Sequence, residues 1–102
     1  MSRTKITDAG LTEVAKLQQL TSLDLTRCFQ ITDAGLKEMV NLKWLKALGL
    51  VDTQITDEGL KEVAKLQKLT HLNLSDTQVT KAGVAELKKA LPKCEIRSNP
   101  TK

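Results

Sequence analysis

Apolar positions along this chain follow two different spacings that recur in a fixed order. In the first spacing, leucines two residues apart alternate with polar or small residues at 23–25, 48–50 and 72–74, which predicts strands with one buried face. In the second, Leu60, Val63, Ala64 and Leu66 fall on one face of a helix. Each unit is therefore expected to contain a strand, a turn and a helix, each with one apolar face.

The units repeat at an almost constant interval. The segment Ile-Thr-Asp-x-Gly-Leu, or a looser copy of it, begins at Ile6, Ile31, Ile55 and Val79. A second pattern, Leu-x-x-Leu-x-Leu-x-x-Cys/Thr/Asn with two substitutions in its last copy, begins at Leu20, Leu45, Leu69 and Leu91. This pattern aligns Cys94 and Ile96 with the inward leucines of earlier strands and makes the last unit two residues shorter. Because no unit can bury its apolar faces alone, the units are expected to stack.

The second pattern resembles the leucine-rich repeat family from about Thr4 to Asn99. Together with the Ile-Thr-Asp-x-Gly-Leu segment it is similar to the cysteine-containing subtype, to bacterial ITDAGL-type repeats and to the repeat arms of F-box proteins. The resemblance implies an α/β solenoid of about four short repeats, with parallel strands on the concave face and helices on the convex face. Thr replaces Cys or Asn in the middle repeats, and no F-box-like segment accompanies them, so a ubiquitin-ligase role is not expected.

The 102 residues are expected to form a single domain, 1–102, in three parts. A helix without a preceding strand occupies 1–19, the central repeats occupy 20–78, and a capping repeat with a tail occupies 79–102. The expected helix N-caps are Thr7, Thr32, Thr56 and Thr80, and an Asp after three of them favours the positive end of the helix dipole. A Gly recurs in each first turn, where it costs about 1 kcal/mol relative to Ala. We expect it to permit close approach of neighbouring backbones.

The net charge of +4 lies entirely in the segment 81–102, because the segment 1–80 holds ten basic and ten acidic side chains. A charged end is typical of a solvated terminal cap. Binding of nucleic acid or of anionic lipid through this end remains a minor alternative. For nucleic acid, Trp44 and Phe29 are the whole aromatic supply for stacking. No apolar run reaches about 18 residues and the start is polar, so we expect no membrane partner and a cytoplasmic location.

Catalysis, cofactors and metals are not expected. His71 is the single histidine, and Ser75 lies roughly 13 Å along the same strand, too far for a nucleophile and base pair. One histidine and scattered carboxylates do not provide the three or four converging ligands of a stable metal site. Cys28 and Cys94 lie at least about 14 Å apart, beyond disulfide reach, so both are expected to be reduced.

Outward positions of the strands form columns across the predicted stack. The columns are Ser22, Ala47, His71 and Lys93; Asp24, Gly49, Asn73 and Glu95; Thr26, Val51, Ser75 and Arg97; and, at the turn, Arg27, Asp52, Asp76 and Ser98. These residues vary while the framework repeats, which leaves them free to specialise. The candidate partner-binding residues are Asp24, Thr26, Arg27, Val51, Asp52, His71, Asn73, Ser75 and Asp76, with Trp44, whose counterparts Gln19 and Lys68 indicate an exposed position. The alternative for Trp44 is a ring that lies flat over its neighbours in the loop between helix and strand.

The sequence thus predicts a non-catalytic protein–protein interaction module that presents a curved surface. The alternative is a structural, self-associating repeat unit, either a segment of a longer solenoid or an idealised repeat protein. In that case two chains are expected to meet through their N-terminal ends, because charges and Pro92 protect the C-terminal end and nothing comparable protects the edge at 22–26.

Overall fold

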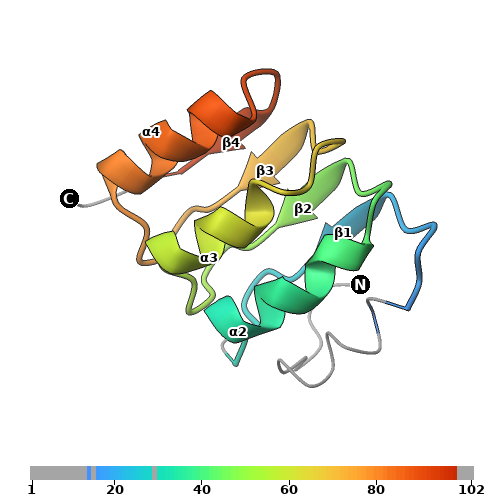
Figure 1. Cartoon of the computed structure of the whole chain (residues 1–102). Helices are drawn as coiled ribbons and strands as arrows, with labels where there is room; N and C mark the ends of the chain where they lie inside the picture. Colours follow the sequence, from blue (N-terminus) through green and yellow to red (C-terminus); the bar gives the residue numbers. More distant parts are fainter. Residues whose placement is uncertain (1–13, 15, 29, 99–102) are drawn as a thin grey trace.

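A computed structural model of the chain, which describes residues 14, 16–28 and 30–98, shows a parallel four-stranded sheet backed by helices (Figure 1). The strands are β1 (Ser22–Asp24), β2 (Ala47–Gly49), β3 (His71–Asn73) and β4 (Glu95–Arg97), and they are ordered in space as in the sequence. Each strand is short because only the central leucine or isoleucine and its two neighbours lie between the turns. The expected α/β leucine-rich solenoid of about four repeats is confirmed.

The helices lie side by side on one face of the sheet, as Figure 1 shows. They are α2 (Asp33–Leu36), continued by the 3-10 helix η1 (Lys37–Asn41), α3 (Asp57–Val63) and α4 (Lys81–Ala90). None of the helices in the described ranges is long and apolar enough to cross a bilayer. The helix expected in the N-terminal part falls mostly on residues 1–13 and 15, outside the described residues.

The core is a continuous column of leucine, isoleucine and valine between sheet and helices. Leu23, Leu48 and Leu72, the central residues of β1 to β3, are at most 3% exposed. The helical positions Leu60 and Val63 are buried on the same core. Both spacings read from the sequence are therefore confirmed, and burial of these aliphatic side chains is the main force that holds the repeats together.

The register of the last repeat differs from the sequence-based alignment. In the sheet, His71 pairs with Glu95, Leu72 with Ile96 and Asn73 with Arg97. The prediction that Cys94 aligns with Leu72, and that the last unit is two residues shorter, is therefore wrong. Helix α4 is the longest of the described helices and is followed by a buried Leu91, so the strand begins later than the leucine pattern indicates.

The Ile-Thr-Asp-x-Gly-Leu segment connects each repeat to the next by hydrogen bonds. The Thr32, Thr56 and Thr80 side chains cap their own helices, as expected. The carboxylate of Asp57 accepts from the Thr80 backbone N–H at 2.8 Å and from the Thr80 hydroxyl at 2.6 Å. Asp33 accepts from Thr56 in the same way. The Asp is therefore more than a helix-dipole residue, because it joins neighbouring repeats.

The recurrence of Gly within the segment has a specific cause. A Cβ at Gly83 would clash with the carboxylate of Asp57, and a Cβ at Gly59 would clash with that of Asp33. The expectation that Gly allows backbones to approach is corrected, since the neighbour is the Asp side chain of the preceding repeat. In the last repeat Lys81 occupies the position of this Asp, so α4 does not carry the carboxylate that the earlier helices use.

The turn after each of the first three strands contains one residue in the left-handed backbone region. These residues are Arg27, Asp52 and Asp76, with φ of 63°, 60° and 60°. Asp tolerates this conformation better than Arg does, since its short polar side chain bonds locally. Next to Asp52 the Thr53 hydroxyl donates to the Leu50 carbonyl at 2.8 Å, which confirms that a small side chain at this position bonds the turn backbone.

Candidate interaction surface

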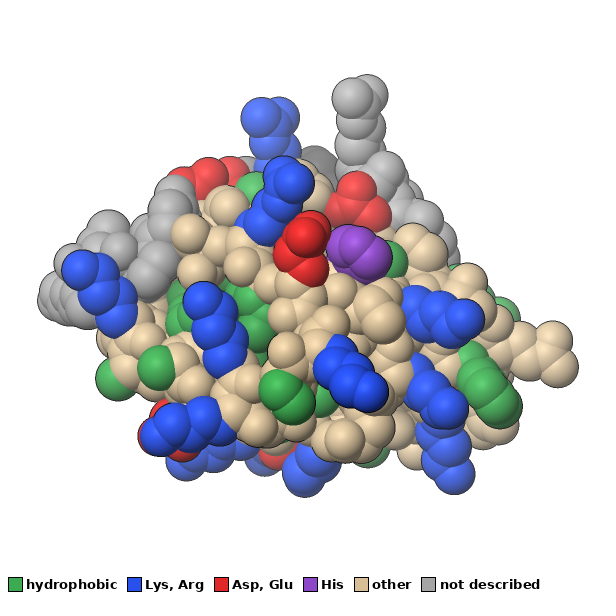
Figure 2. Space-filling view, turned by 90° about the horizontal axis from the view of Figure 1, so that it is seen from above, with side chains coloured by type: hydrophobic (Ala, Val, Ile, Leu, Met, Phe, Trp, Pro, Cys, Tyr) green, Lys and Arg blue, Asp and Glu red, His purple; other side chains and the backbone are tan. Residues whose placement is uncertain are grey.

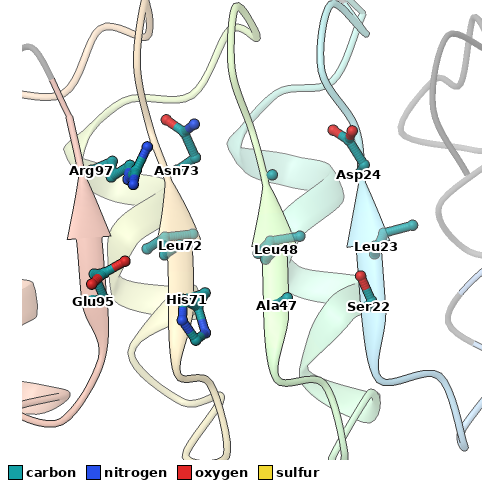
Figure 3. Close-up of a pocket in the computed structure, with 11 residues that line it drawn as sticks. Ser22, Leu23, Asp24, Ala47, Leu48, His71, Leu72, Asn73, Glu95 and Arg97 are labelled. Atoms are coloured by element: carbon teal, nitrogen blue, oxygen red, sulfur yellow. The ribbon is translucent and has the colours of Figure 1, made fainter.

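The sheet face away from the helices forms a shallow groove of about 310 Å³, lined by outward residues of all four strands (Figure 3). The middle of its floor is low, because the two outward residues of β2 are the small Ala47 and Gly49. The walls carry longer polar side chains from β1 on one side and from β3 and β4 on the other. We call this surface the concave groove.

One wall of the concave groove is built around Asp24. Its Oδ1 atom accepts from the Thr26 backbone N–H at 3.0 Å and from the Thr26 hydroxyl. A Cβ at Gly49 would lie 2.8 Å from the same Oδ1 atom, so the absence of a side chain at 49 leaves room for the carboxylate. Both bonds to Thr26 use one of the two carboxylate oxygens, and the residue is exposed. Asp24 can therefore also accept from a donor on a partner.

The opposite wall repeats this turn with neutral groups. Asn73 Oδ1 accepts from the Ser75 N–H at 3.1 Å and from the Ser75 hydroxyl at 2.8 Å. His71 Nδ1 lies 3.0 Å from the Thr70 hydroxyl oxygen. The imidazole is thus positioned by its neighbour and remains exposed above the groove.

β4 adds a pair of opposite charges. Figure 3 shows Arg97 pointing toward Asn73 and Glu95 beside His71, and both residues are exposed. The sequence-based columns placed Glu95 beside Asn73 and Arg97 beside Ser75, and Lys93 beside His71. These three placements are wrong, because the pairing of β4 with β3 moves each residue by one outward position. The register between β3 and β4 was the information that the sequence pattern did not provide.

The predicted site residues do not all come together. Asp24, His71 and Asn73 line the concave groove, while Thr26 and Ser75 support it through the hydrogen bonds above. A second group forms the turn beyond the strands: Arg27, Val51, Asp52 and Asp76. There the Arg27 N–H donates to the Val51 carbonyl, and the Asp52 N–H donates to the Ser75 carbonyl. The backbone of this second group therefore holds adjacent turns together.

Trp44 lies apart from the concave groove, in the loop between η1 and β2. Its side chain is 54% exposed, and its counterparts Gln19 and Lys68 are exposed as well. The Lys68 ammonium lies 5.5 Å from the centre of its ring, a distance typical of a cation–π contact. The ring thus rests against the next repeat with much of its surface in solvent. Phe29 lies outside the described residues.

Reactive groups are scattered over the described residues. Among residues 14, 16–28 and 30–98 there is no group of three His, Cys, Asp or Glu placed to hold a metal. Cys28 is buried and Cys94 half-buried, and neither forms a disulfide. Burial raises the pKa of the Cys94 thiol, and the nearby Glu95 carboxylate raises it further. A raised pKa leaves less thiolate, which is the nucleophilic form.

The comparisons with known proteins agree with this architecture. Residues 11–94 match the family of Zer-1-like leucine-rich repeats. A solved leucine-rich repeat protein from Leptospira interrogans is 27% identical, with a TM-score of 0.58 over 83% of this chain. This chain covers 27% of the length of that protein. No curated protein is a detectable relative of the chain.

Proposed function

The chain belongs to the Zer-1-like leucine-rich repeat family, and we propose that it is a non-catalytic module that binds a protein partner through the concave groove. Proteins of this architecture present a rigid curved surface on repeating strands. The proposal includes the absence of enzymatic activity and the cytoplasmic location expected from the sequence. The partner is a protein with side chains that enter the space above Ala47 and Gly49.

The observation that carries this proposal is the shape of the groove floor. Small residues on β2 lie between exposed polar walls, so a partner side chain can reach the sheet backbone while polar groups bond to either wall. Asp24 offers an acceptor on one wall, and Arg97 and Asn73 offer donors on the other. A specific protein interface usually has an apolar centre and a polar rim, and a floor of small residues between polar walls fits that arrangement.

The test is affinity capture with a matched pair of variants. Ala47→Arg fills the groove, whereas Ala82→Arg adds the same side chain at an exposed position on α4. A partner bound by the parent protein and by Ala82→Arg, and lost with Ala47→Arg, would support the proposal. A partner that is lost only with Ala82→Arg would place the interface on the helices and refute it. Thermal unfolding of both variants checks that the fold is retained.

Self-association is the second candidate function, and one observation favours it. Leu17 is 51% exposed, although Leu42 and Leu66, its counterparts in the next two repeats, are 1% and 4% exposed. An apolar core position at the β1 end of the stack is suited to a neighbouring apolar surface, which a second copy of the chain can supply about a two-fold axis. Sedimentation at micromolar concentration tests this. A dimer that Leu17→Glu dissociates is expected, and a monomer at all concentrations would reject it.

A further inference from the structure

Lysines gather at the end of the molecule where each repeat passes from helix to strand. Four segments meet there: 16–21, 41–46, 65–70 and 88–94. Together they contain eight lysines and no aspartate or glutamate, and all eight lysines are exposed. Backbone bonds hold neighbouring segments side by side, since Lys46 N–H donates to Thr21 O at 2.7 Å and Thr70 N–H donates to Lys46 O at 2.8 Å. We call this surface the lysine face.

The opposite end of the stack has the opposite charge. The strand-to-helix segments 24–33, 49–58 and 73–82 contain six acidic and two basic side chains, a net charge of −4. Each of these repeats supplies one segment to the lysine face and one segment to the acidic end. The positive and negative charges therefore cancel along the segment 1–80, although they lie at opposite ends of the stack. Figure 2, which looks down on the molecule from the top of Figure 1, shows Lys and Arg side chains over much of the visible surface and acidic side chains close to the histidine.

Helix electrostatics explain only part of this arrangement. Lys88 and Lys89 lie in the last turn of α4, where the helix dipole favours a cation. Lys65 and Lys89 also form ion pairs with the half-buried Glu62 and the exposed Glu86, at 3.2 and 3.7 Å. Three further lysines, in contrast, lie in the loops beyond the helix ends: Lys43, Lys46 and Lys68. Nothing in the stability of a helix requires a lysine at those three positions.

The lysine face also contains the exposed large hydrophobic side chains that the structure describes, Leu17 and Trp44. Trp44 stands in the loop between two lysines, Lys43 and Lys46, with Lys68 against its ring. The Trp44 indole is thus exposed to solvent in the middle of a cationic surface. A partner that covers the ring would remove its apolar surface from water, which is favourable.

We infer that the lysine face docks on an anionic lipid membrane surface. The cations are all lysines, whereas protein interfaces are depleted in lysine and enriched in arginine, which binds carboxylates in pairs of hydrogen bonds. Flexible lysines suit a layer of mobile anionic headgroups, and tryptophan favours the interface between headgroups and hydrocarbon. A single indole provides no row of stacking positions for nucleic acid. This proposal differs from the sequence-based expectation of no membrane partner, because it concerns docking on the membrane surface and not a membrane-spanning segment.

Trp44 supplies the experiment with its own signal, because it is the single tryptophan of the chain. The protein is titrated with vesicles of phosphatidylcholine containing about 30 mol% phosphatidylserine, and with vesicles of phosphatidylcholine alone. The expected result is a blue shift of Trp44 emission and co-sedimentation with the anionic vesicles only. Added salt should weaken the binding.

Two triple variants with the same net charge distinguish binding through the lysine face from a general electrostatic attraction between the protein and anionic vesicles. Lys43→Gln, Lys46→Gln and Lys68→Gln together should weaken vesicle binding on the order of 100-fold, from roughly fivefold for each lysine. Lys37→Gln, Lys61→Gln and Lys81→Gln, on the helices, should weaken it less than about fivefold, because these side chains lie away from the face. Equal losses in both variants would overturn the inference. So would binding without a Trp44 shift, or a shift with polyglutamate or duplex DNA and none with the vesicles.

Discussion

The bond between repeats is tested most sharply by adding one methyl group at Gly83. Thr80 accepts from the Gly83 N–H at 3.1 Å and donates its hydroxyl hydrogen to Asp57, whose carboxylate also receives the Thr80 N–H. In Gly83→Ala the new Cβ occupies the place of that carboxylate. The carboxylate must move away, and both of its bonds to Thr80 are lost while the rest of the helix stays unchanged.

The magnitude follows from two opposing effects. Hydrogen bonds to a charged group contribute about 1.5–3 kcal/mol each, and the half-buried position of Asp57 allows water to replace part of this, so the two together are taken as about 2–3 kcal/mol. Ala instead of Gly in a helix gains at most about 1 kcal/mol. Gly83→Ala should therefore destabilise the protein by about 1–2 kcal/mol. In a protein that already carries Asp57→Ala, the clash is absent, and the same change should be neutral or stabilising by up to about 1 kcal/mol.

Urea unfolding of the parent protein, both single variants and the double variant gives the four free energies of this cycle. The prediction is a coupling energy of about 2–3 kcal/mol between positions 57 and 83, with a change of sign for Gly83→Ala between the two backgrounds. Gly83→Ala that costs the same with and without Asp57 would refute the reasoning, since the carboxylate would then not be the group that excludes a side chain.

Four further changes probe other parts of the fold. Leu72→Ala should lower the free energy of unfolding by about 2–5 kcal/mol, because the side chain is 2% exposed at the centre of β3, and an unchanged thermal midpoint would contradict the register. Thr53→Val should cost about 1–2 kcal/mol in urea unfolding, since the Leu50 carbonyl loses its buried hydroxyl donor, and it should cost more than the same change at an exposed Thr. Arg27→Asn should stabilise by about 0.5–1 kcal/mol, because Asn adopts the φ of 63° more easily, and a lower melting temperature would count against this. Cys94 should react slowly with iodoacetamide, because burial first and the Glu95 carboxylate second raise the pKa of the thiol and reduce the thiolate fraction, and Glu95→Gln should speed the reaction at fixed pH. Because the pKa of Cys94 is raised in the folded protein, the contribution of the thiol to stability is present below about pH 8.5 and is lost as the pH rises further.

The repeating core was predictable because it depends on local spacing. The leucines two residues apart specified β1 to β3, and the nearly constant repeat period specified which of them pair. The last strand was misaligned because Leu91, Cys94 and Ile96 mimic that spacing. Pairing between strands is set by backbone bonds and by the length of α4, and neither is visible in so short an apolar pattern.

The candidate surface was predictable only in part. His71, Asn73 and Asp24 were found because they sit at outward positions of well-defined strands. The lysine face was hidden because lysines from four separate loops come together only after the repeats stack, and the acidic residues between them in the sequence go to the other end or to the helices. Likewise, the role of Gly83 depends on the Asp57 carboxylate of the preceding repeat. The repeat period places Asp57 one repeat earlier, but the sequence does not show that its carboxylate contacts Gly83.

The central claim, that the concave groove receives a protein partner, is tested most directly by photo-crosslinking. A photoreactive amino acid is placed at His71 on the groove wall and, as a matched control, at Lys61 on α3, both of which are exposed. After irradiation of cells that produce the protein, a discrete adduct with one partner is expected from position 71 and none from position 61. The same adduct from position 61 and none from position 71 would contradict the claim.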